Sequence, residues 1–108
     1  MEYSNKLILI NKFNLLLDNF NITNKLNRVS FKDVSYLPEG QEWLIELTNG
    51  ENVYIHKCSY NVDNPEVNYV WVEYSKEDGI FIEINYKDKT VKKFIIISAN
   101  EIKKEIKL

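Results

Sequence analysis

The sequence predicts an α+β fold: an antiparallel meander sheet of five or six strands, with an N-terminal helix and a short C-terminal helix. Three patterns support this prediction: a helical apolar stripe near the start, several runs that alternate apolar and polar residues, and a helix-capping motif near the end. The strand-like runs are joined by connections so short that neighbouring strands must be antiparallel. The 108 residues contain no linker or repeat, so we expect a single domain over residues 1–108.

The N-terminal helix is predicted over residues 4–20. Apolar side chains recur there at intervals of three or four residues and cover about a third of the helical circumference. They are Leu9, Ile10, Phe13, Leu16, Leu17 and Phe20. Ser4 has a side chain suited to capping the first turn, and the Asn-rich residues 19–24 suit a helix end because asparagine tolerates the left-handed conformation.

The clearest strand signal surrounds Asn49-Gly50. A first strand is predicted over residues 28–37, and the next two are predicted over residues 43–48 and 52–58. Asn-Gly is the preferred pair for a two-residue type I′ turn, because both positions of that turn need a positive φ.

Such a turn fixes the register of the hairpin. It predicts the cross-strand pairs Trp43 with His56, Ile45 with Tyr54, and Glu42 with Lys57. The side expected to face the core then carries Trp43, Ile45, Leu47, Tyr54 and His56.

Three more strands are predicted over residues 67–74, 80–86 and 90–97, after a loop over residues 59–66. Alternation would place on one core face Val67, Tyr69, Trp71, Ile80, Ile82, Ile84, Val91, Ile95 and Ile97. The opposite faces of the strands are also apolar, and carry Leu44, Ile55, Val70, Val72, Phe81 and Phe94. Either the second helix covers that side or it forms a partner site.

The C-terminal helix is predicted from a capping box, in which a serine is followed three residues later by a glutamate. The motif spans Ser98 to Glu101. Ile102 and Ile106 follow four residues apart, which is the spacing of one helical stripe.

The composition favours the cytoplasm. Cys58 is the only cysteine, so no internal disulfide can form, and a small secreted domain would often contain paired cysteines. The N-terminus lacks the positive start and long apolar run of a signal peptide. No stretch approaches the roughly 20 apolar residues of a membrane span.

The sequence contains no recognisable catalytic, cofactor or metal site. His56 is the only histidine, and in a strand its side chain would lie too far from that of Cys58 for a hydrogen bond. A zinc site needs three or four such ligands. All three glycines fall in predicted turns, so none is left for a phosphate-binding loop. A small enzyme that uses carboxylates stays an alternative, although nothing singles out a pair among the 16 acids.

Charge is distributed unevenly along the chain. Residues 39–83 hold ten acids and two bases, together with both tryptophans and four of the seven tyrosines. An acidic surface with aromatic anchors suits a basic protein partner, because opposite charge speeds encounter and buried aromatics supply affinity. The acids predicted to bind this partner are Glu42, Glu46, Asp63, Glu66, Glu73, Glu77 and Asp78. The alternative is a solvated face that only maintains solubility.

The chain resembles the small bacterial immunity proteins that accompany toxins of contact-dependent growth inhibition. The resemblance lies in size, in α+β character and in an amino-acid composition that suggests an AT-rich gene, with 13 Lys, 14 Asn and 13 Ile but one Arg and one Ala. It implies a cytoplasmic antitoxin without enzyme activity or cofactor. Such a protein neutralises a cognate toxin, expected here to be a basic nuclease domain, by covering its active or substrate-binding surface.

A phage-encoded inhibitor of a nucleic-acid-guided nuclease, of the anti-CRISPR type, fits the same features. Direct binding of nucleic acid is not expected, because a net charge of −2 and a single arginine suit phosphate contacts poorly. No contact with a membrane is expected either.

Overall fold

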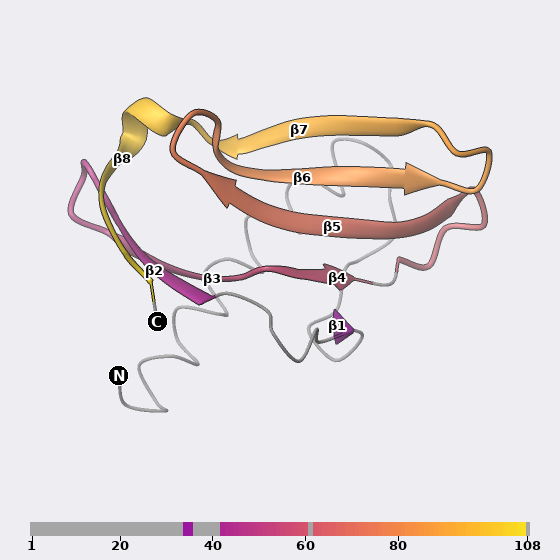
Figure 1. Cartoon of the computed structure of the whole chain (residues 1–108), viewed down its shortest axis with the longest axis horizontal. Coiled ribbons are helices and arrows are strands. Elements are labelled where there is room, and N and C mark those ends of the chain that lie inside the picture. The colour runs from indigo at the N-terminus through magenta and orange to yellow at the C-terminus, as the bar shows by residue number, and fades with distance from the viewer. Residues whose placement is uncertain (1–33, 36–41, 61, 108) are drawn as a thin grey trace.

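The structure is a computed structural model that describes residues 34–35, 42–60 and 62–107. The described residues form two antiparallel sheets (Figure 1). The five-stranded sheet has the order β1-β4-β5-β6-β7, and the three-stranded sheet has the order β3-β2-β8. The elements are β1 (Val34–Ser35), β2 (Glu42–Leu47), β3 (Asn52–His56), β4 (Cys58–Tyr60), β5 (Val67–Ser75), β6 (Gly79–Tyr86), β7 (Val91–Ile97), the 3₁₀ helix η2 (Ala99–Glu101) and β8 (Ile102–Lys107).

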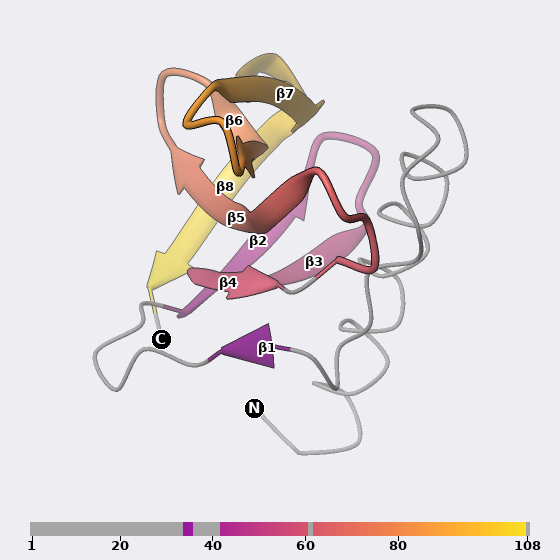
Figure 2. The same cartoon turned by 90° about the vertical axis from the view of Figure 1, so that its right-hand side faces the viewer.

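The chain passes between the two sheets at three places: between β1 and β2, between β3 and β4, and between β7 and β8. Only Lys57 separates β3 from β4, so one nearly continuous extended run contributes its first half to one sheet and its second half to the other. The chain changes sheet again at η2, which joins β7 to β8. Figure 2 shows the result: β2 and β8 run obliquely behind the strands of the larger sheet. Among the described residues, no helix is long and apolar enough to cross a membrane.

The predicted α+β class is wrong for the part of the chain that the structure describes. The predicted C-terminal helix is replaced by the single 3₁₀ turn η2 and then by strand β8. The capping motif does form, since the Ser98 backbone N–H donates to the Glu101 carboxylate at 2.9 Å. Ile102, however, is extended, with φ −100° and ψ 122°. The predicted N-terminal helix over residues 4–20 lies outside the described residues.

Tertiary pairing explains why the C-terminal segment is a strand. A helix of one or two turns is barely stable alone, whereas β8 gains a full backbone ladder along the edge of β2. The ladder pairs Leu44 with Ile106 and Ile45 with Glu105. A register shift in this ladder pairs Ile102 with Leu47 and Ile106 with Leu44, so the two isoleucines that suggested a helical stripe lie on opposite faces of the sheet.

The β2–β3 hairpin has a loop of three residues rather than two. The Leu47 N–H donates to the Glu51 carbonyl at 2.8 Å, which encloses Thr48, Asn49 and Gly50. Gly50 has a φ of +89°, but Asn49 does not have the positive φ that a type I′ turn requires. A three-residue loop that ends in a left-handed glycine is the next commonest hairpin connection.

The extra loop residue shifts the predicted register by one. Trp43 pairs with Ile55, and Ile45 pairs with Val53. On β2 the predicted core face is confirmed, because Trp43 and Ile45 are buried. On β3 the predicted core face is wrong. Val53 and Ile55 share the core face, and Tyr54 lies on the opposite one.

A bulge in β5 changes a second predicted face. The register of β5 against β6 shifts between Val67 and Tyr69. Beyond the shift, Val70 and Val72 point to the core, and Trp71 points away from it. The core between the two sheets is built from Trp43, Ile45, Leu47, Val53, Ile55, Val67, Val70, Val72, Ile80, Ile82, Ile84 and Ile97.

Candidate functional site

Two of the acids predicted to bind a partner lie on the three-stranded sheet. Glu42 and Glu46 project from β2 on the side opposite to the buried Trp43 and Ile45. The Tyr54 hydroxyl donates a hydrogen bond to the Glu42 carboxylate. Both acids are half-buried, so they form part of a structured sheet surface.

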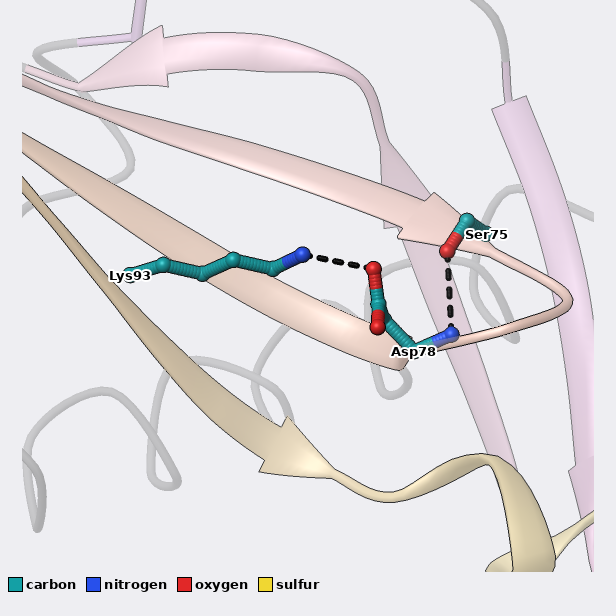
Figure 3. A network of polar contacts seen from close by, with 3 residues as sticks. All are labelled: Ser75, Asp78 and Lys93. Atoms are coloured by element: carbon teal, nitrogen blue, oxygen red, sulfur yellow. Dashed lines mark hydrogen bonds and ion pairs between the residues drawn. The ribbon is translucent and has the colours of Figure 1, made fainter.

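Two more of the predicted acids, Glu73 and Asp78, have basic partners within the chain. The Glu73 carboxylate accepts a hydrogen bond from Trp71 Nε1 at 2.9 Å, and Lys57 Nζ lies 3.2 Å from its other oxygen. Asp78 forms an ion pair of 2.5 Å with Lys93 Nζ (Figure 3). These internal pairs cancel much of the charge that Glu73 and Asp78 could offer to a partner.

Asp78 also shapes the turn between β5 and β6. Its backbone N–H donates to Ser75 Oγ at 3.1 Å, as Figure 3 shows. The ammonium of Lys93 lies 4.1 Å from the centre of the Phe81 ring, a distance typical of a cation–π contact. One lysine thus connects the turn, β6 and β7.

The remaining predicted acids are exposed, and no described residue forms an ion pair with them. Asp63 and Glu66 lie in the loop before β5, and Glu77 lies in the turn after it. β5 has nine residues, so at roughly 3.3 Å per residue these two positions are about 30 Å apart. Figure 1 shows the loop and the turn at opposite ends of the sheet. The structure therefore spreads the seven acids over two sheets and both ends of one of them.

The outward side of the five-stranded sheet is apolar, as the sequence predicts for the second face of the strands, but most of its residues differ from the predicted ones. We call this surface the outer face; it carries Tyr69, Trp71, Glu73, Phe81, Glu83, Val91, Lys93 and Ile95. Val91 is 51% exposed and Ile95 is 47% exposed. Tyr69 and Trp71 are half-buried. The sequence-based prediction of this second face named other residues of β5, because simple alternation from Val67 assigned Tyr69 and Trp71 to the core.

A second group of side chains meets where the core opens to solvent. We call it the rim cluster; it consists of Trp43, Tyr74, Lys76 and Glu105. The rings of Trp43 and Tyr74 lie 5.5 Å apart, tilted by 59°. Lys76 Nζ lies 3.7 Å from Glu105 Oε1. Burial, followed by polar interaction with the Glu105 carboxylate and by its negative charge, raises the pKa of Tyr74 to about 12.

Glu105 has an unusual position for a carboxylate. Its register partner on β2 is Ile45, which is fully buried, so the side chain of Glu105 points toward the core. Glu105 Oε2 is buried and accepts no hydrogen bond from the residues that the structure describes. Sequence reasoning missed the rim cluster because it placed Glu105 in a helix, far from Tyr74.

The described residues contain no group of three His, Cys, Asp or Glu residues placed to hold a metal ion. The side chains of His56 and Cys58 are outside the described part, so the predicted distance between them stays a prediction. Comparisons of the chain with protein-family models, with curated proteins and with solved structures gave no match.

Proposed function

We propose that the protein is an inhibitor of the immunity type, which binds a cognate toxin domain and covers its active or substrate-binding surface. The outer face is the observation that supports this proposal most. Its centre is aromatic and aliphatic, and exposed acids border both ends of β5. Protein interfaces share this arrangement of an apolar, aromatic centre within a charged rim.

The charges at the ends of β5 favour a basic partner. Asp63 and Glu66 at one end and Glu77 at the other are exposed. No described residue neutralises them, so their charge remains available to steer a partner. A nuclease domain is the basic partner with the clearest need for an acidic inhibitor, because its own surface must attract phosphate. Binding would occur in the cytoplasm, without direct contact to nucleic acid or membrane.

The partner is tested by coexpression with the product of the adjacent gene, pull-down, and titration calorimetry at low and high salt. We expect tight one-to-one binding that weakens as salt rises, because exposed charges are screened. If only a nucleic-acid-guided nuclease is captured, the protein is an inhibitor of that nuclease and the toxin proposal is wrong. Failure to bind either protein would also contradict it.

Substitutions locate the interface. Trp71→Ala should weaken binding by about 2 kcal/mol, because central aromatic residues supply much of the affinity of an interface. Glu66→Lys and Glu77→Lys should slow association several-fold at low salt, since rim charges act mainly on the association rate. Glu51→Lys is the matched control, because Glu51 is an exposed acid in the β2–β3 loop. An equal effect of the control and the two test substitutions would show that only net charge matters.

A further inference from the structure

The rim cluster contains a carboxylate that this chain leaves only partly satisfied. Glu105 Oε2 is buried without a hydrogen-bond donor from the described residues. A buried acceptor without a donor is unfavourable, so a ligand that supplies one gains free energy. The side chain of Glu105 as a whole keeps 27% of its surface exposed, so the residue borders solvent although Oε2 itself is buried.

The cation beside this carboxylate is held weakly. Lys76 Nζ lies 3.7 Å from Glu105 Oε1, near the outer limit for an ion pair, and the Lys76 side chain is 84% exposed. Exposed pairs of this kind contribute little to stability, because solvent screens them and the lysine loses side-chain entropy. Another cation can therefore replace Lys76 at small cost.

Aromatic rings complete the site. Trp43 and Tyr74 pack together beside the carboxylate, and aromatic faces attract cations, guanidinium groups in particular. The Tyr74 hydroxyl is protonated at neutral pH and already interacts with the Glu105 carboxylate. Glu105 Oε2 nevertheless accepts no hydrogen bond from the described residues, so this oxygen retains acceptor capacity for an incoming donor.

We propose that the rim cluster binds an arginine side chain of the protein partner, whose guanidinium displaces Lys76 and donates to both oxygens of Glu105. The choice of arginine over lysine follows from the two acceptor atoms. A planar guanidinium presents two parallel N–H donors, whereas an ammonium acts as a point charge. The inference rests on the proposed function, since a basic partner supplies the arginine, and Lys76 is the chain neighbour of the exposed Glu77.

The site is tested without the partner. The full chain, labelled with ¹⁵N, is titrated with methylguanidinium and, separately, with methylammonium at constant ionic strength. The readout is the indole N–H signal of Trp43, which Trp71→Phe distinguishes from the other tryptophan. We expect a saturable shift with methylguanidinium and a weaker response to methylammonium.

Three variants make the test specific. Glu105→Gln keeps the shape of the side chain and should abolish the saturable shift. Lys76→Ala removes the competing cation and should tighten methylguanidinium binding by roughly threefold, which corresponds to the modest free energy of an exposed ion pair. Lys103→Ala is the matched control on β8 and should leave the affinity unchanged.

Several outcomes would overturn the inference: equal affinity for both cations, an unchanged shift in Glu105→Gln, or equal effects of Lys76→Ala and Lys103→Ala. The Lys76→Ala result decides the matter even if Glu105→Gln does not fold. Failure of this titration leaves the proposed function standing if the partner is still captured. Capture of no partner, together with guanidinium binding, would contradict the proposed function and keep the site.

Discussion

Replacing Gly79 by alanine should disrupt the corner between β7 and η2. Gly79 has a φ of +86°, and a Cβ atom there would lie 2.2 Å from the Ile97 carbonyl oxygen and 2.7 Å from the Ala99 nitrogen. Both atoms belong to the backbone, so neither can rotate away. To restore van der Waals contact, the β5–β6 turn or the η2 corner must move by about 1 Å.

Gly50 provides the matched control for this substitution. Its φ of +89° is nearly the same, but no atom lies within 4 Å of the position that a Cβ would take. Gly50→Ala should therefore cost only the left-handed backbone strain, about 1–2 kcal/mol. Gly79→Ala should cost this strain plus about 1–3 kcal/mol of overpacking, so its total is about 2–5 kcal/mol.

Urea unfolding followed by tryptophan fluorescence measures the difference. With a urea m-value of roughly 1–3 kcal/mol/M, an extra loss of about 2 kcal/mol lowers the midpoint of Gly79→Ala by roughly 1 M relative to Gly50→Ala. Equal midpoints for the two variants would refute the reasoning, because they would show that the corner yields to the added methyl group at no cost.

Two further predictions concern the core and its rim. Tyr74 has a folded-state pKa of about 12 against 10.0 in the unfolded chain, so the unfolded state loses its proton first. Stability should hold below pH 10 and fall between pH 10 and pH 12, by at most about 2.7 kcal/mol and by about 1 kcal/mol after solvent screening at the rim. Urea unfolding midpoints measured across this pH range check the prediction. If the midpoint of a Tyr74→Phe variant falls as steeply with pH, the prediction is wrong. Ile82 is 1% exposed and Ile95 is 47% exposed. In thermal unfolding, Ile82→Ala should lower the free energy of unfolding by about 3–4 kcal/mol and Ile95→Ala by less than about 1 kcal/mol. Similar losses for the two variants would contradict the assignment of Ile82 to the core and of Ile95 to the surface.

The sequence located most of the described strands, because alternation of apolar and polar residues is a local signal. It predicted the wrong core-facing residues wherever a hairpin loop or a strand contained one extra residue. The three-residue loop at Gly50 and the bulge after Val67 each reverse the orientation of the side chains that follow. The segment after Glu101 became a strand because its hydrogen-bond partner is β2, which is remote in sequence.

The same limit applies to the candidate sites. A count of acids along the chain cannot show that Glu73 is paired with Lys57 or that Asp78 is paired with Lys93, because the partners lie on neighbouring strands. The rim cluster is harder still to foresee, since Trp43, Tyr74 and Glu105 come from three strands and two sheets. Only the fold decides which charges remain exposed.

The pairing of β2 with β8 has a consequence for folding kinetics. This ladder joins segments roughly 60 residues apart in the chain, whereas β5, β6 and β7 pair across short turns. The β5–β6–β7 part of the larger sheet and the β2–β3 hairpin can therefore form early from local contacts, while β8 must wait for a long loop to close before it pairs with β2. Until then β2 exposes an unpaired edge beside apolar residues, which is the kind of surface that promotes association between partly folded chains.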